Sequence, residues 1–127
     1  MRILVTGSRD WPYAQIVGWE LDKATAGIRP VTIVEGACPT GADNFAWGWV
    51  CRESFDDTQV HGERHPADWA KHGRSAGFVR NQEMVALGAD LCLAFVYNES
   101  RGTSHCVRAA RMAGIPCRVI DLRITEA

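Results

Sequence analysis

Short apolar runs alternate with longer polar segments along this chain. The runs at residues 3–5 and 91–96 are continuously apolar, which is typical of strands that helices cover on both faces. Such strands belong mainly to parallel sheets, in which each strand is joined to the next by a helical crossover. The pattern predicts strands at residues 2–6, 31–35, roughly 58–61, 91–96 and 117–122.

Helical periodicity fills the segments between these strands. After the first strand, Pro12 precedes an apolar stripe that consists of Val17, Leu21, Ala24 and Ile28. The next helix has apolar residues at i, i+3, i+4, i+7 and i+8, namely Ala42, Phe45, Ala46, Trp49 and Val50. Thr40 and Asp43 form a capping-box-like pair at its start. Two further helices are expected, from about Phe78 to the stop at Gly88 and from Thr103 to the stop at Gly114.

Strands that alternate with helices predict an α/β fold. We expect a three-layer, Rossmann-like doubly wound sheet of about five mainly parallel strands in the order 3-2-1-4-5. The chain has 127 residues, of which 46% are hydrophobic, so residues 1–127 are expected to form a single domain. No apolar run approaches the roughly 18 residues that span a bilayer, and the start lacks the apolar stretch of a signal peptide. These features predict a cytoplasmic protein without membrane contact.

Cysteines and net charge narrow the possible chemistry. The five cysteines are odd in number and include no closely spaced pair, which is typical of reduced thiols. Cys92 and Cys117 fall in strand-like runs and are expected in the core, whereas a catalytic thiol at Cys38 or Cys106 stays open. The net charge of −1 supplies no general attraction for polyanions, so nucleic acid is not an expected partner.

Glycine and small polar residues follow three of the predicted strands, at residues 7–11, 36–43 and 98–103. The carboxyl ends of parallel strands meet at one edge of a sheet, and ligands bind there where the strand order reverses. Glycine allows a phosphate to approach main-chain N–H groups, and the helix that follows presents further donors. The three loops therefore predict a cradle for a phosphate-bearing ligand. Neither Gly-x-Gly-x-x-Gly nor the P-loop motif is present, which argues against an ordinary dehydrogenase or P-loop ATPase.

Four arginines are expected near this edge, and a guanidinium matches the geometry of phosphate. Arg9, Arg74 and Arg80 are expected at the ligand, with Arg80 close to a helix start, where a cation needs an anionic partner. Arg101 is expected to be a solvated surface residue.

The segment at residues 65–77 is long and polar, and it is a candidate lid or rim. His61, His65 and His72 lie around it with Asp68, but their spacing does not favour a metal site.

The tryptophans call for different explanations. Trp49 fits the apolar stripe of the second helix, whereas Trp11 and Trp69 occur in site loops where an indole can stack on a base. Trp19 and Trp47 lie partly off the apolar stripes and are candidates for a subunit interface.

Six separated elements together resemble one protein family. They lie, in order, at residues 7–11, 35–36 with 41–43, 65–69, 72–74 with 76–77, 80–81 with 84, and 102–103. This set resembles the YspA-like, YpsA-related branch of the SLOG superfamily over nearly the whole chain. The resemblance implies a Rossmann-like fold that binds nucleotides or related ligands, often as a homo-oligomer. We accordingly expect a homodimer or a higher homo-oligomer.

The same superfamily contains phosphoribohydrolases, whose site has an Arg-Lys pair followed by Gly-Gly-x-Gly-Thr-x-x-Glu. This chain departs from that pattern, because Arg80 and Asn81 replace the pair and only Gly102 and Thr103 remain of the glycine motif. Cys106 stands where the glutamate is expected. The carboxylate that would assist cleavage of an N-glycosidic bond is therefore missing at that position.

We expect a module that binds a nucleotide or a nucleotide-derived ligand, such as an ADP-ribose or NAD-like molecule. Its expected role is to sense, sequester or present this ligand. No cofactor is expected to be required, and no metal site is expected. The expected ligand-binding residues are Gly7, Ser8, Arg9, Asp10, Trp11, Gly36, Gly41, Ala42, Asp43, His65, Asp68, Trp69, Arg74, Arg80, Asn81, Gly102 and Thr103. The alternative is a nucleotide-processing enzyme in which Asp43 or Asp68 acts with Arg80, and Ser8 or Thr103 donates hydrogen bonds. A third hypothesis, a single-stranded nucleic-acid binder, is disfavoured by the charge.

Overall fold

The computed structural model describes residues 1–98 and 100–122, and its centre is a five-stranded parallel sheet. The strands are β1 (Arg2–Gly7), β2 (Val31–Glu35), β3 (Val60–Arg64), β4 (Leu91–Tyr97) and β5 (Cys117–Leu122). Their order is β3-β2-β1-β4-β5, and every neighbouring pair is parallel. The predicted fold class and strand order are confirmed. Glu99 of the third predicted loop and residues 123–127 of the predicted domain lie outside the described residues.

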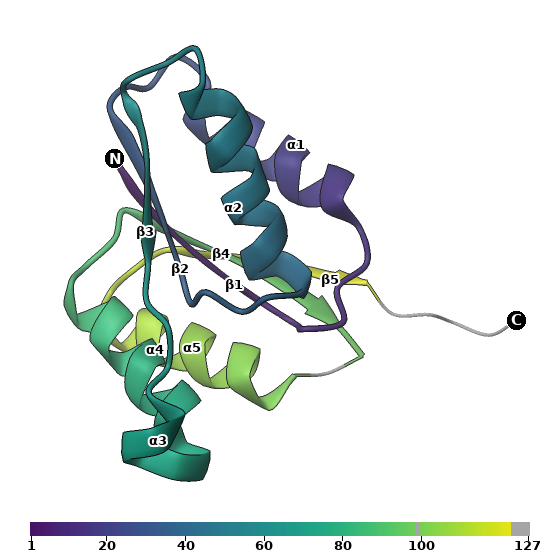
Figure 1. The fold of residues 1–127 in the computed structure, drawn as a ribbon. Helices are drawn as coiled ribbons and strands as arrows, with labels where there is room; N and C mark the ends of the chain where they lie inside the picture. The colour runs from purple at the N-terminus through teal and green to yellow at the C-terminus, as the bar shows by residue number, and fades with distance from the viewer. Residues whose placement is uncertain (99, 123–127) are drawn as a thin grey trace, which may run out of the picture.

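Helices cover both faces of the sheet (Figure 1). On one face, α1 (Ala14–Thr25) and α2 (Gly41–Ser54) pack over a core that includes Val17, Leu21, Ala46 and Trp49. On the other face, α4 (Ala76–Ala86) and α5 (Arg101–Met112) pack over a second core that includes Met84, Cys92 and Ala110. The short α3 (Trp69–His72) and a 3₁₀ turn (Gly73–Ser75) precede α4. Within the described part of the chain, no helix is both long and apolar enough to cross a bilayer.

Several element boundaries differ from the sequence-based expectation. The third strand starts at Val60 rather than Thr58, because the Asp57 carboxylate binds the N–H of Gln59 and holds a turn before it. Only Val60 of this edge strand is buried, so one apolar residue marks the start of the strand and nothing in the pattern marks its end. The first helix ends at Thr25, and Ile28 lies beyond it with 39% of its surface exposed. Pro12 lies before the first helical residue, Ala14, rather than inside the first turn.

The helix starts also correct our expectations. Thr40 is the N-cap of α2, but its side chain makes no capping hydrogen bond, so the predicted capping box is wrong. The helices α4 and α5 begin at Ala76 and Arg101, two residues earlier than expected. The helix α5 starts early because Ser100 caps it before its first buried residue, Thr103. Arg80 consequently lies in the second turn of α4.

A close contact joins β1 to α2 at the carboxyl edge of the sheet. A Cβ atom on Gly7 would lie 2.4 Å from the Cβ of Ala42 and 2.8 Å from the carbonyl oxygen of Phe95. Gly41 has a φ of +73°, and a Cβ there would lie 2.2 Å from the carbonyl oxygen of Ser8. Both glycines are therefore required for the fold at this edge, whether or not a ligand is present.

We predict that Gly7→Ala destabilises the protein by about 1–3 kcal/mol, because the added methyl group meets backbone and a packed side chain. Gly18→Ala is the control, since the nearest atom to its Cβ would be 3.9 Å away in the middle of α1. That control should stabilise the helix by about 0.5–1 kcal/mol. Urea unfolding followed by circular dichroism measures both, and equal stabilities for the two variants would contradict this account.

Candidate functional site

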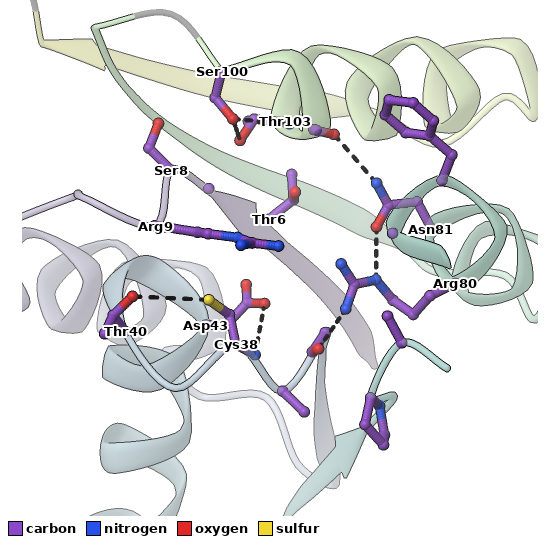
Figure 2. A pocket seen from close by; sticks show the side chains of 18 of the residues that line it. Thr6, Ser8, Arg9, Cys38, Thr40, Asp43, Arg80, Asn81, Ser100 and Thr103 are labelled. Carbon is purple, nitrogen blue, oxygen red and sulfur yellow. Dashed lines mark hydrogen bonds between the residues drawn. The ribbon is translucent and has the colours of Figure 1, made fainter. Parts of the chain in front are cut away.

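A pocket of about 770 Å³ opens at the carboxyl edge of the sheet (Figure 2). It lies at the point between β1 and β4 where the strand order of the sheet reverses direction. Its volume is in the range of small-molecule and cofactor sites. Its walls come from the loop after β1, the loop between β2 and α2, the segment before α4, the first two turns of α4 and the start of α5. The structure places the following predicted residues in its lining: Gly7, Ser8, Arg9, Asp10, Gly36, Asp43, Trp69, Arg74, Arg80, Asn81, Gly102 and Thr103.

Three other predicted residues serve the packing of the edge instead. Trp11 is only 1% exposed, packs edge-on against Phe95 with ring centroids 5.3 Å apart, and lies in the core. The expected stacking of its indole on a base is therefore corrected. Gly41 and Ala42 are buried at the start of α2 and do not line the pocket.

His65 and Asp68 also lie outside the pocket lining. The carboxylate of Asp68 accepts a hydrogen bond from the N–H of Lys71 and caps α3. The Nε2 atom of His65 lies 3.0 Å from a carboxylate oxygen of Glu63. Within the described part of the chain, no group of three or more His, Cys, Asp or Glu side chains could hold a metal ion.

Arg80 is the most firmly anchored cation of the pocket. Its Nε donates to the side-chain oxygen of Asn81 at 2.9 Å, and its Nη1 donates to the carbonyls of Gly36 and His65. Its Nη2 has no hydrogen-bond partner among the residues that the structure describes. Figure 2 shows this nitrogen directed toward the space between Arg80 and Arg9. The guanidinium thus presents one fixed edge to a ligand.

Gly36 makes room for this guanidinium. A Cβ atom at Gly36 would lie 2.4 Å from Nη1 of Arg80 and 3.0 Å from a carboxylate oxygen of Asp43. The backbone that follows β2 can thus contact the arginine only because position 36 carries no side chain.

Asn81 connects Arg80 to the start of α5. Its Nδ2 donates to the carbonyl of Gly102 at 3.2 Å. Ser100 caps α5, because its hydroxyl accepts hydrogen bonds from the N–H and the hydroxyl of Thr103. The remaining first-turn N–H groups of a helix have no partner within the helix, and they carry a partial positive charge. The start of α5 and Arg80 together form the anion-receptive part of the pocket.

The loop after β2 differs from this arrangement. Its successive N–H groups are taken by carboxylates: those of Gly36 and Cys38 by Asp43, and that of Ala37 by Glu35. The expectation that backbone donors from all three loops meet a phosphate is therefore corrected for residues 36–38 of this loop. Their N–H groups are already bonded to carboxylates, so this part of the loop contributes shape rather than an anion site.

Asp43 has the most perturbed acid–base chemistry in the lining. Its side chain is buried at the start of α2, and burial raises the pKa of this carboxyl to about 6. The nearby negative charge of Glu35 raises the pKa further, whereas Arg80 and the N–H groups of the loop oppose the shift. Asp43 therefore changes its charge close to neutral pH inside the pocket.

The rim carries an aromatic side chain beside a cation. Trp69 of α3 is 50% exposed, and the guanidinium carbon of Arg9 lies 5.5 Å from the centre of its ring. Arg74 lines the same side of the pocket and is exposed. The segment at residues 65–77 thus forms part of the rim through Pro66, Ala67, Trp69 and Arg74. Arg101 is exposed and does not line the pocket.

The residues that were predicted individually leave out part of the lining. The lining residues within predicted loops, the predicted rim or the family elements are Ala37, Cys38, Pro39, Thr40, Pro66, Ala67, Gly77, Met84 and Ser100, and those outside these segments are Val5, Thr6 and Phe78. Most of them lie next to a predicted residue, and Ser100 could have been found as the N-cap that stands three residues before Thr103.

The cysteines are all free. Cys106 is buried, and burial raises the pKa of its thiol to about 11, which makes it a poor nucleophile at neutral pH. Cys38 lines the pocket and lies 3.9 Å from the hydroxyl of Thr40. Cys92 is buried as expected, whereas Cys117 is only partly buried.

Comparison with known proteins identifies the family of this chain. The model of the YspA, cpYpsA-related SLOG family matches residues 1–72. The Gene 61 protein of Mycobacterium phage D29 is 46% identical over 123 residues, which cover 91% of this chain and 92% of that protein. No solved structure matches the chain. Membership of this family fits a nucleotide-related function. The chain belongs to the YspA, cpYpsA-related SLOG family.

Proposed function

We propose that this protein binds a nucleotide-derived ligand of the ADP-ribose or NAD type and acts by sensing, sequestering or presenting it. The observation that carries the proposal is the anchored guanidinium of Arg80, whose Nη2 has no hydrogen-bond partner among the described residues and which Asn81 connects to the start of α5. A phosphate between these groups receives two kinds of fixed positive charge, a guanidinium and a helix start.

The charge of the lining supports an anionic ligand. Among the residues that the structure describes, the charged members of the lining are three arginines (Arg9, Arg74 and Arg80) and two aspartates (Asp10 and Asp43). The volume of about 770 Å³ leaves space for more than a single phosphate group.

Trp69 is the side chain that we assign to the base of the ligand. Its ring is half exposed at the rim and already accepts a cation on one face. A flat base can stack on the same kind of surface, and such stacking contributes about 1–3 kcal/mol in single-stranded nucleic-acid complexes. In this arrangement Arg9 leaves the ring and moves toward the phosphate groups.

A second candidate is a nucleotide-processing enzyme, and the pKa of Asp43 favours it. A buried carboxyl with a pKa of about 6 is suited to general acid–base catalysis near neutral pH. Hydrolysis of an N-glycosidic bond would add water across the bond, with Asp43 transferring the proton and Arg80 holding a phosphate. Asp68 no longer qualifies, because it caps α3 outside the pocket lining.

We also propose that the protein forms a homodimer or a higher homo-oligomer. Trp19 on α1 is 61% exposed, which suits an interface. Trp47 instead packs under the guanidinium of Arg64 at 4.6 Å and is no longer needed as an interface residue. Light scattering of the wild type and Trp19→Gln tests this: a wild-type oligomer that dissociates in the variant supports the proposal, and a monomeric wild type contradicts it.

We predict that Gly36→Ala weakens ADP-ribose binding at least about tenfold while the protein stays folded, because the new methyl group displaces the flexible end of Arg80 rather than backbone. Calorimetric titration measures the affinity, and Gly18→Ala serves as the control with unchanged binding.

Heating the purified protein and analysing the released molecules by mass spectrometry tests for a ligand that co-purifies. The proposal fails if no nucleotide co-purifies and none changes the melting temperature.

Asp43 should make this binding depend on pH. Below its pKa of about 6 the carboxyl is neutral, and above it a negative charge lies near Arg80 and repels the ligand. Affinity for ADP-ribose, whose pyrophosphate keeps its charge, should therefore rise about three- to tenfold as the pH falls from about 7.5 to about 5.5. Asp43→Asn should bind tightly across this range. An equally steep pH dependence in that variant would assign the effect to another group.

Turnover separates the two candidate functions. If the protein is an enzyme, Asp43→Asn should lower kcat at least about a hundredfold while the ligand still binds. Asp68→Asn is the matched control, because it removes the same charge from a carboxylate that caps α3 outside the lining. Product analysis by liquid chromatography measures both variants, and turnover that survives Asp43→Asn would exclude the mechanism.

A further inference from the structure

One peptide group beside the pocket is held at both ends by charged side chains. The N–H of Ala37 donates to a carboxylate oxygen of Glu35 at 2.6 Å. The carbonyl of Gly36, which belongs to the same peptide bond, accepts a hydrogen bond from Nη1 of Arg80. The C=O and N–H of a trans peptide point in opposite directions, so a group that fixes one of them fixes the other. Glu35 and Arg80 are thus connected through one peptide.

Glu35 itself does not line the pocket. It is the last residue of β2, and its side chain is only 1% exposed. In dinucleotide-binding Rossmann folds an acid near this place binds a ribose hydroxyl. Here both carboxylate oxygens are occupied, one by the N–H of Ala37 and the other by Nε of Arg64 at 2.6 Å. The carboxylate therefore acts on the protein's own backbone rather than on a ligand.

The backbone conformation at Ala37 needs such a restraint. Ala37 has a φ of 58°, in the left-handed region that residues with a Cβ rarely adopt. Rotation of the Gly36–Ala37 peptide toward a negative φ would relieve this strain, and it would turn the Gly36 carbonyl away from Arg80. The hydrogen bond to Glu35 opposes that rotation.

Only a carboxylate suits this position. Both partners of Glu35 are N–H donors, and an ionised carboxylate accepts through both oxygens. A glutamine would turn its NH₂ group toward one of the two donors and leave that donor unpaired. The negative charge also balances Arg64, which in turn packs over Trp47 of α2. The restraint on the peptide is therefore built into the packing between β2, β3 and α2.

We infer that Glu35 is a positioning residue that fixes Arg80 for the ligand. It does so by holding the Gly36–Ala37 peptide in the orientation that goes with the left-handed conformation of Ala37. The importance of this for binding rests on the proposed function, whereas the positioning of Arg80 is a property of the protein without ligand. The two can therefore be tested separately.

The first experiment observes Arg80 in the ligand-free protein by ¹⁵N NMR, with Arg80→Gln used to assign its guanidinium signals. Restricted rotation should give separate Nη signals for Arg80 in the wild type. In Glu35→Gln these signals should merge as the guanidinium becomes mobile. Glu20→Gln, which removes the same charge from the remote ion pair with Arg118, should leave them separate. Separate Arg80 signals in Glu35→Gln would overturn the inference even if no ligand were known.

The second experiment is a double-mutant cycle with ADP-ribose as the probe. Glu35→Gln should weaken binding about tenfold, and in the Arg80→Gln background it should weaken binding no further. Equal losses in both backgrounds would mean that Glu35 acts on the fold and not through Arg80. If Glu35→Gln fails to fold, Glu35→Asp, which is too short to reach both donors, replaces it in both experiments with the same expectations. If wild-type protein binds no nucleotide, the proposed function fails and the NMR result still decides the role of Glu35.

Discussion

The pocket depends on two carboxylates that are buried beneath the turn after β2. Glu35 and Asp43 lose their contact with water, and in exchange they accept hydrogen bonds from consecutive N–H groups of the turn. Burial of charge is unfavourable unless it is paired, and here the pairing is completed by Arg64 on one side and by the field of Arg80 on the other. The turn, the two acids and the two arginines therefore form one connected unit of hydrogen bonds and charges.

The fold could be predicted from the sequence where burial on both faces leaves a continuous apolar run. This is the case for β1 and β4, which lie at the centre of the sheet. It fails for β3, an edge strand with a single buried residue, where the side-chain pattern carries no information about the end of the strand. The predicted start of α5 was wrong for a related reason, since the cap at Ser100 precedes the apolar stripe from which the start was predicted.

The site was predictable where a residue type has one dominant use. Glycines next to parallel strands and arginines in the same loops do meet in one pocket, as Gly36 and Arg80 illustrate. Trp11 was misjudged because an indole in a loop can equally fill the core, and only the position of Phe95 decides between the two. The sequence also places Glu35 two residues before Ala37, yet nothing in it indicates that the side chain turns back onto the N–H of Ala37.

The two walls of the pocket belong to opposite layers of the molecule. Asp43 extends from α2 on one face of the sheet, and Arg80 and Asn81 extend from α4 on the other (Figures 1 and 2). The layers meet at this edge through loops and through the bonds of Arg80 to the carbonyls of Gly36 and His65. A molecule that filled the pocket would contact both layers and would hold them together. Occupancy would therefore add contacts between the start of α4, through Arg80 and Asn81, and the loops that lead into α2 on the opposite face.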